Sequence, residues 1–233
     1  MARRRKKKPI PIIIAVVIAF IIAQFGISGD FTSTLDKVED LFNSTFSTSE
    51  NQDPGSTNEG APFDTSICRL IEVDGGDRSG EREPLAAVDI GFGDREYWAY
   101  TNEHGQLVYV TADVITLQDD DKEPVTDSGR YYHDEANVPG CESPVLDQGH
   151  VIADSLGGVS NAYNITPQDS TLNRHGDQAY MEEVIRKAGG CTDFIAIITY
   201  PNTKTHTPSH YEYHYTVKGN DVVDSYPNAN PEK

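Results

Sequence analysis

Residues 147–187 read DQGHVIADSLGGVSNAYNITPQDSTLNRHGDQAYMEEVIRK, and this stretch carries the strongest structural signals in the chain. Its last part, residues 179–187, has a helix-forming composition and is followed by two glycines, which commonly end helices. Beyond the glycines, residues 194–200 form an Ile-rich apolar run typical of a strand, and residues 211–217 alternate in polarity. The stretch therefore predicts a helix followed directly by strands.

The residues upstream of this stretch predict further strands and one long loop. Residues 96–99 and 106–110 flank the segment Asn102-Glu-His-Gly105, which is typical of a hairpin, and residues 68–73 resemble a short strand. Residues 119–140 are acidic and rich in turn residues, so they predict a loop. Strands, a loop, one helix and further strands indicate an α+β domain with an antiparallel sheet.

The same stretch holds the side chains that phosphodiester cleavage requires. His150 is a base that is neutral near pH 7, and Asp147, three residues earlier, is placed to orient its ring. Asn164 and Asn173 offer neutral oxygen ligands that suit a hard cation such as Mg²⁺. Arg186 offers a guanidinium fork for a phosphate. A base, a hard cation and a guanidinium together indicate phosphodiester hydrolysis.

Each of these residues alone has an ordinary structural explanation. A single histidine is more often structural than catalytic, and buried asparagines usually form hydrogen bonds in turns. Glu182 with Arg186, and Glu183 with Lys187, are pairs four residues apart, which commonly lie on solvated helix faces. The functional interpretation therefore depends on the order and spacing of the whole set.

That order resembles a known family, the DNA/RNA non-specific endonucleases, which are ββα-metal (His-Me finger) nucleases. The resemblance rests on Asp147-Gln-Gly-His150, Asn164-Ile-Thr-Pro-Gln, Leu172-Asn173, Glu182 and Arg186. The family includes secreted sugar-non-specific nucleases and membrane-anchored DNA-entry nucleases. The resemblance implies an antiparallel sheet with a ββα-metal core, in which His150 ends a strand and Asn173 begins a helix.

The resemblance also implies a role for each matching residue. His150 is expected to be the general base that activates a water, and Asn173 the direct protein ligand of one Mg²⁺, with Mn²⁺ or Ca²⁺ as alternatives. Asn164 is expected to hold the motif or the substrate by hydrogen bonds. Glu182 is expected to bind metal-coordinated water, and Arg186 to stabilise the pentacoordinate phosphate. Cleavage would leave a 5′-phosphate and a 3′-hydroxyl.

Two departures from the family pattern bear on these expectations. The family usually has Asp-Arg-Gly-His, whereas Gln148 stands at the arginine position and removes one cation. The helix acid usually follows the metal asparagine by eight residues, but Glu182 is the ninth after Asn173, so an unbroken helix would place it on the opposite side. Gly176 could absorb the extra residue before the helix begins, and Glu183 is the competing acid.

The first 62 residues differ in composition from the rest of the chain. The apolar run from Ile10 to Ile27 would span roughly 27 Å as a helix, close to the hydrocarbon thickness of a membrane. The basic residues before it place the N-terminus in the cytoplasm and the rest of the chain outside. A cleaved signal peptide is the alternative, and it would give a secreted protein. The expected organisation is a cytoplasmic basic segment (1–9), a transmembrane anchor (10–28), a juxtamembrane helix and flexible linker (29–62) and the endonuclease domain (63–233).

The charge of the chain limits how it can bind nucleic acid. Six of its 19 Lys and Arg residues lie in residues 3–8, so the remainder has 13 basic against 37 acidic residues, a net charge of −24. This composition excludes a basic architectural protein, and the 37% hydrophobic content excludes wholesale disorder. Either the acids lie away from the cleft, or divalent cations bridge the repulsion, or a basic partner delivers the nucleic acid.

Three cysteines are too few for a disulfide scaffold. Cys141 and Cys191 bracket the motif, and an oxidising compartment would allow them to pair, although Cys68 could replace either one.

We therefore expect a single-pass membrane enzyme that hydrolyses DNA, RNA or both outside the cytoplasm, for uptake or scavenging of nucleic acid. Its expected partners are the nucleic-acid substrate and the membrane, with DNA-uptake machinery as a further partner. A nuclease toxin, whose partner would be an immunity protein, is the first alternative. The second is a catalytically weak family member that binds nucleic acid or a protein partner, because Gln148 and the net charge both weaken phosphate binding.

Overall fold

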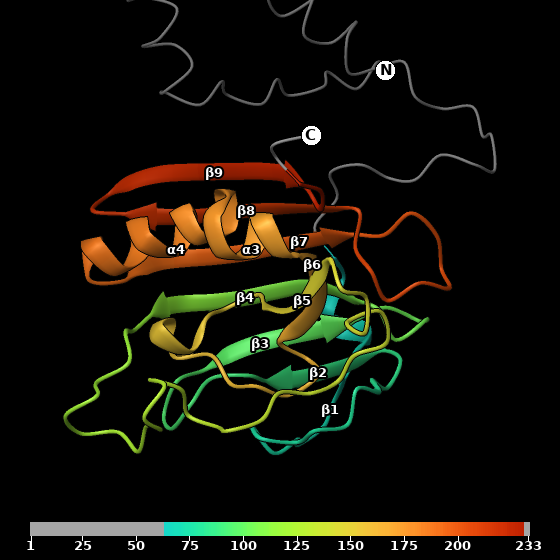
Figure 1. Ribbon diagram of the computed structural model, residues 1–233, viewed down its shortest axis with the longest axis horizontal. Coiled ribbons are helices and arrows are strands. Elements are labelled where there is room, and N and C mark those ends of the chain that lie inside the picture. The colour runs from blue at the N-terminus through green and yellow to red at the C-terminus, as the bar shows by residue number, and fades with distance from the viewer. Residues whose placement is uncertain (1–62, 231–233) are drawn as a thin grey trace, which may run out of the picture. The chain divides into compact units, whose positions relative to one another are not determined.

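The computed structural model describes residues 63–230, and its largest element is a seven-stranded sheet (Figure 1). All neighbouring strands are antiparallel except β1 and β2, which are parallel. In spatial order the strands are β1 (Arg69–Leu70), β2 (Ala86–Asp89), β3 (Tyr97–Thr101), β4 (Leu107–Ile115), β7 (Cys191–Thr199), β8 (His210–Val217) and β9 (Asn220–Pro227).

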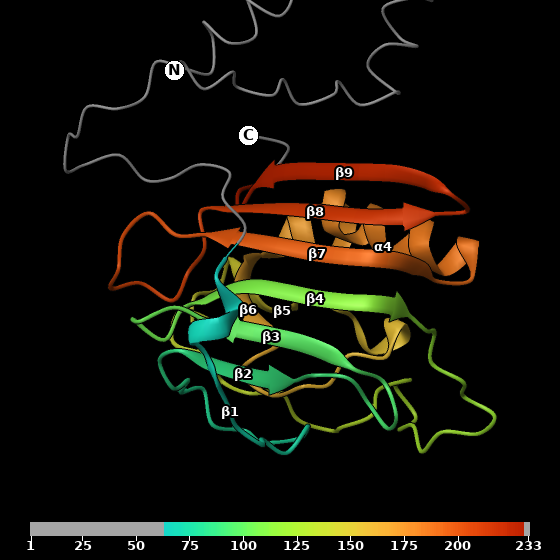
Figure 2. The ribbon, with the colours of Figure 1, turned by 180° about the vertical axis from the view of Figure 1, so that it is seen from behind.

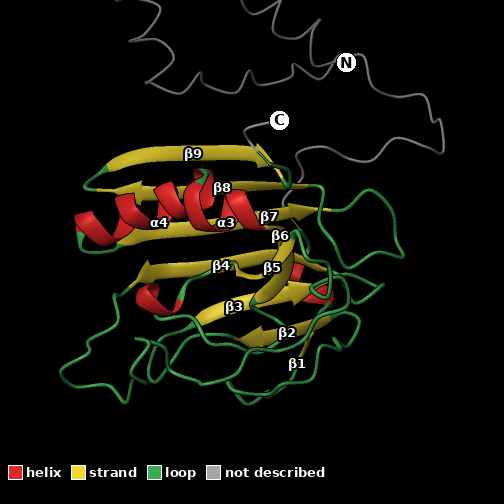
Figure 3. Ribbon diagram, in the orientation of Figure 1, coloured by secondary structure: helices red, strands yellow, loops and turns green. Residues whose placement is uncertain are grey.

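A second, smaller unit is inserted in the sequence between β4 and β7. It consists of the antiparallel pair β5 (Leu146–His150) and β6 (Ile165–Asp169), followed by α3 (Ser170–His175) and α4 (Asp177–Ala188). These elements lie on one face of the large sheet, whereas in residues 63–230 the other face carries only the single 3₁₀ turn η1 (Thr65–Ile67) and no α-helix (Figures 1 and 2). Two antiparallel strands followed by helix match the ββα arrangement that the family resemblance implies, and Figure 3 separates these elements by colour.

The hydrophobic core lies between the large sheet and this ββα unit. Along β8, alternate residues are buried, as expected for a sheet with one covered face. Tyr211 and Tyr213 from β8 are fully buried, and Met181 and Ile185 from α4 belong to the same cluster. The position of α4 is therefore fixed by apolar side chains on the face that it turns towards the sheet.

A break in the helix at Gly176 separates Asn173 on α3 from Glu182 on α4. Gly176 has an extended backbone, with φ −100° and ψ −154°, and it separates the last residue of α3 from the first residue of α4. Asp169 caps α3 by accepting hydrogen bonds from the backbone of Thr171 and Leu172, and α4 ends at Gly189 in the left-handed region. The helix predicted at residues 179–187 is confirmed as part of α4, whereas Asn173, which the resemblance places at the start of a helix, lies within the separate segment α3. Asn173 and Glu182 therefore do not share one unbroken helix.

The hairpin of β3 and β4 is confirmed, and residues 119–140 contain neither helix nor strand. The three cysteines are free, so neither the pair Cys141–Cys191 nor a pair with Cys68 forms in this structure. Within residues 63–230 no helix is long and apolar enough to cross a membrane. The predicted anchor (10–28) and linker (29–62) lie outside the described residues.

Candidate active site

His150 is the last residue of β5, and its side chain is almost enclosed, with 11% exposed. Its Nδ1 atom lies 3.8 Å from a carboxylate oxygen of Glu135, and its Nε2 atom lies 3.5 Å from one of Asp154. Neither distance is that of a good hydrogen bond, and Nε2 is buried without a hydrogen-bond partner. Burial lowers the pKa of His150 to about 4, with Asp154 acting in the opposite direction and Arg130 in the same direction. The imidazole is therefore uncharged at neutral pH.

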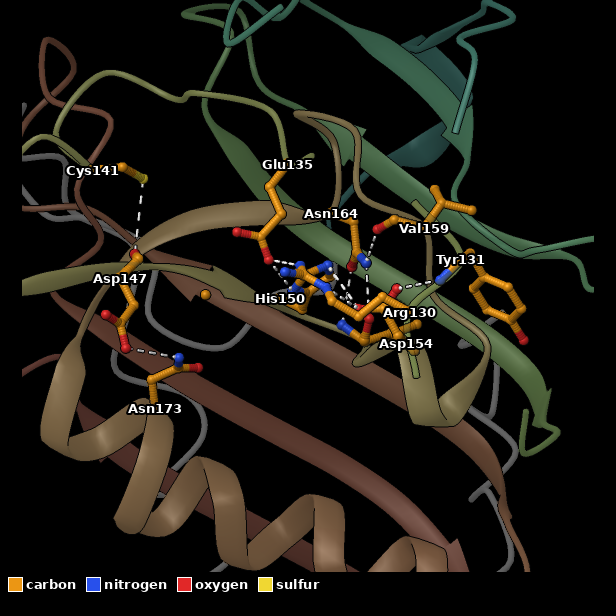
Figure 4. A network of polar contacts seen from close by, with 12 residues as sticks. Arg130, Tyr131, Glu135, Cys141, Asp147, His150, Asp154, Val159, Asn164 and Asn173 are labelled. Carbon is orange, nitrogen blue, oxygen red and sulfur yellow. Dashed lines mark hydrogen bonds and ion pairs between the residues drawn. The ribbon is translucent and has the colours of Figure 1, made fainter. Parts of the chain in front are cut away.

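Asp147 does not contact this ring, so the prediction that it orients His150 is wrong. The two residues are three apart on one strand, and an odd separation turns their side chains to opposite faces. Asp147 instead accepts hydrogen bonds from Asn173 Nδ2 at 3.1 Å and from Arg174 Nε and Nη2 at 2.8 and 2.6 Å. Figure 4 shows Asn173 reaching from α3 towards Asp147, away from the group around His150. Asp147 therefore positions the expected metal ligand.

Three charged residues that the sequence did not single out as neighbours surround His150. Arg130 forms an ion pair with Glu135, and its Nε atom lies 3.5 Å from Asp154 (Figure 4). Asp154 begins the short 3₁₀ helix η2 (Asp154–Leu156), and Glu135 belongs to the acidic loop. The four-residue step from His150 to Asp154 is a weak sequence signal. The periodicity of the sequence could not have predicted that Glu135 lies beside His150.

The loop that supplies Arg130 and Glu135 is anchored by a partly buried network. Glu123 pairs with Arg95 at 2.7 Å and accepts a hydrogen bond from the Tyr131 hydroxyl at 2.6 Å. Burial opposes ionisation of Glu123, but these partners outweigh it and hold the pKa of this carboxyl at about 2. The ring of Tyr131 stacks on Phe92 with centroids 3.7 Å apart, so Tyr131 packs inside the loop.

Asn164 is fully buried and holds the connection between β5 and β6. Its Nδ2 atom donates to the carbonyls of Ile152 and Val159 at 2.8 and 2.7 Å, and its Oδ1 atom accepts from the backbone of Ile152 at 2.9 Å. All of these bonds are to backbone, so Asn164 fixes the segment that follows His150 and has no free polar atom directed at solvent.

Asn173 lies on α3 and is half-buried. Because Asp147 can only accept, the nitrogen of the Asn173 amide must face it, which leaves the amide oxygen for another partner. His150 and Asn173 are not in direct contact. The two residues lie on adjoining elements, β5 and α3.

Glu182 and Glu183 have contrasting environments on α4. The Glu182 side chain is 16% exposed and accepts a hydrogen bond from Gln178 at 2.9 Å, and burial raises its pKa. Glu183 is 47% exposed and pairs with Lys187 at 2.6 Å. Glu182 therefore faces the interior beside the motif, whereas Glu183 faces solvent.

Arg186 lies one turn after Glu182 and is largely exposed. Its guanidinium is 4.0 Å from Glu182 and donates to the Ser155 hydroxyl at 3.4 Å. Arg186 and Ser155 line a hollow of about 590 Å³ whose wall includes three consecutive acids, Asp119–Asp121. These acids are therefore close to the expected phosphate-binding arginine, so this part of the negative charge does not lie away from the site.

Gln148, at the usual arginine position, is half-buried on β5 opposite Pro167. In residues 63–230 no group of three His, Cys, Asp or Glu side chains is placed to hold a cation. The available donors are the Asn173 amide oxygen and the Glu182 carboxylate.

Comparisons with known proteins identify the family of the chain. A family model for DNA/RNA non-specific endonucleases matches residues 90–218, whereas no curated protein matches the chain. Among solved structures, magnesium-bound NucA from Streptococcus agalactiae is 16% identical, with a TM-score of 0.43, covering 59% of this chain and 74% of that one. NucA without metal is 15% identical, with a TM-score of 0.42, covering 64% and 77%. Because the family match spans more than half of the 233 residues, the chain belongs to the DNA/RNA non-specific endonuclease family and is a nuclease.

Proposed function

We propose that this nuclease uses Mg²⁺ to hydrolyse DNA, RNA or both with little sequence specificity, outside the cytoplasm, during uptake or scavenging of nucleic acid. The observation that supports this most is the state of His150. It is a buried, uncharged imidazole with an unpartnered nitrogen, at the end of a strand packed against the helix that carries Asn173.

His150 has the properties of a general base. With a pKa of about 4 the imidazole is uncharged at neutral pH, so the ring nitrogen that carries no proton can take one from an attacking water. The resulting imidazolium would stand between two carboxylates, Glu135 and Asp154, which stabilise a positive charge there.

The residues present fit a hard divalent cation. The Asn173 amide is turned so that its oxygen is free, and Glu182 is a buried carboxylate whose only close hydrogen bond comes from Gln178. A neutral amide and a carboxylate, completed by water and phosphate oxygens, suit Mg²⁺, with Mn²⁺ or Ca²⁺ as alternatives. When bound, the cation would offset the charge that develops on the phosphate.

Arg186 is the residue we assign to the pentacoordinate phosphate, because it is exposed and lies one helical turn from Glu182. The acids that line the hollow beside it oppose the approach of a polyanion. Divalent cations, or a basic partner such as DNA-uptake machinery, would overcome this repulsion. The location outside the cytoplasm rests on residues 1–28 of the sequence alone.

The test is degradation of plasmid DNA and of RNA by the full chain, with and without Mg²⁺. We expect activity with Mg²⁺, none with a chelator, and a loss of about 10²- to 10⁴-fold in His150→Ala at unchanged melting temperature. Equal activity of wild type and His150→Ala would exclude the proposed base. Binding of nucleic acid without cleavage by the wild type would identify the chain as a catalytically weak family member.

A further inference from the structure

The side chain of Gln178 is fully buried at the meeting point of four elements. Its Nε2 atom donates to the carbonyl of His150 on β5 at 3.3 Å and to the Glu182 carboxylate on α4 at 2.9 Å. Its Oε1 atom accepts from the Tyr226 hydroxyl on β9 at 2.7 Å and, at a longer 3.4 Å, from Gln168 on β6. All four hydrogen-bonding positions of one amide are therefore used.

The chemistry of the partners fixes which way this amide points. A backbone carbonyl can only accept, so the nitrogen of Gln178 must face the His150 carbonyl, and its second proton points to Glu182. The oxygen then faces Tyr226, whose hydroxyl must donate. Rotating the amide by half a turn would place its oxygen against two other oxygens, so Gln178 has one stable orientation.

The location of Gln178 is otherwise suited to an apolar residue. It lies on the inward face of α4 with Met181 and Ile185, and a methionine there would fill a similar volume without the cost of burying an amide. The amide adds directional hydrogen bonds, which connect the His150 end of β5 to the Glu182 carboxylate on α4.

We propose that Gln178 is a positioning residue for the nuclease reaction, which sets the spacing between the His150 end of β5 and the Glu182 carboxylate. This inference rests on the proposed function, because it assumes that His150 and Glu182 act in catalysis. Gln178 itself contacts the backbone of one and the side chain of the other, and it does not reach solvent.

The kinetic test compares Gln178→Met with Ile185→Val in the full chain. Both substitutions alter fully buried positions on α4, but Ile185 makes no hydrogen bond to the site. We expect Gln178→Met to lower kcat by about 10- to 100-fold with little change in KM, and Ile185→Val to leave both nearly unchanged. Melting temperatures measured for both variants separate this effect from loss of stability. Equal kcat values for the two variants at matched melting temperature would overturn the proposal.

A double variant tests whether Gln178 acts through Glu182. If it does, the loss in Gln178→Met combined with Glu182→Ala is smaller than the product of the two single losses. A fully multiplicative loss would contradict the inference.

A measurement without turnover separates this proposal from the proposed function. In NMR spectra of the full chain, the two side-chain amide protons of Gln178 should exchange slowly with D₂O, and Glu182→Ala should make one of them exchange faster. Fast exchange of both protons in the wild type would overturn the positioning role even if the enzyme is active. An inactive wild type with protected Gln178 protons would instead count against the proposed function.

Discussion

The two ends of β5 differ although only two residues separate them. At one end His150 is enclosed by Glu135, Asp154 and Arg130, and burial lowers its pKa to about 4. At the other end Asp147 binds Asn173 and the exposed Arg174. The alternation of side chains along a strand separates the two groups, so one end determines the protonation state of His150, the proposed base, and the other the orientation of Asn173, the proposed metal ligand.

The difference suits the two roles proposed for His150 and Asn173, which need different surroundings. A base must be desolvated enough to stay neutral, whereas a metal ligand needs access to the cation and to solvent water. Substitutions at the His150 end and at the Asp147 end of β5 test whether the two roles are separated in this way.

At the Asp147 end, Asn173→Ala should lower kcat with Mg²⁺ by at least about 100-fold, because the proposed direct protein ligand of the cation is lost. Asn173→Asp should retain part of the activity, since it keeps an oxygen but reduces the positive charge available to the phosphate. Titration of each variant with Mg²⁺, followed by plasmid cleavage, measures both effects. Full activity of Asn173→Ala would show that this end of β5 does not hold the cation.

At the buried end, the stability of the chain should depend on pH through His150. The imidazole titrates near 6.5 when unfolded and near 4 when folded. Between these values the unfolded chain binds a proton that the folded chain does not, so stability decreases as the pH falls from about 6.5 to about 4. The whole difference is roughly 3 kcal/mol.

Urea unfolding at several pH values, in wild type and His150→Asn, measures this dependence. Other titrating groups are common to both proteins, so their contribution cancels in the difference. We expect the variant to lose less stability than the wild type over this range. Parallel stability curves would mean that burial does not hold this imidazole neutral.

Glu182 and Glu183 on α4 differ in exposure in the same way. Glu182→Gln should reduce kcat by about 10- to 100-fold, because a buried carboxylate beside the motif is lost. Glu183→Gln should leave kcat unchanged, because Glu183 is exposed and pairs only with Lys187. Plasmid cleavage rates of these two matched variants decide between the acids. The reverse result would assign the role to Glu183.

The smallest effect is expected for Asp147→Asn. The amide that replaces the carboxylate can still accept from Asn173, so we expect kcat to fall by less than about tenfold and the Mg²⁺ requirement to rise. Arg174→Ala, which removes only the exposed partner, serves as the control and should change kcat by less than about twofold. A loss as large as that of His150→Ala would mean that Asp147 acts directly in the reaction.

The local pattern of the sequence was sufficient for much of the fold. Alternation along residues 211–217 and the apolar run at 194–200 correspond to β8 and β7, and the glycines after residue 187 mark the end of α4. These features depend on neighbouring residues, which the sequence displays directly. The pattern of residues did not predict α3, which only the family resemblance implied, because it is six residues long and ends at Gly176.

The α+β class was determined by the sequence alone, and the residues proposed as base, amide ligand and phosphate-binding arginine were selected from it, because residue chemistry and short-range periodicity do not depend on packing. Only the tertiary structure showed that Glu135 and Asp154 rather than Asp147 face His150, and that Glu182 rather than Glu183 turns inward. Burial and its effect on pKa come from residues far apart in the chain, such as the loop that Arg95 and Glu123 anchor beside β5. Those contacts arise from packing, which no spacing within one segment records.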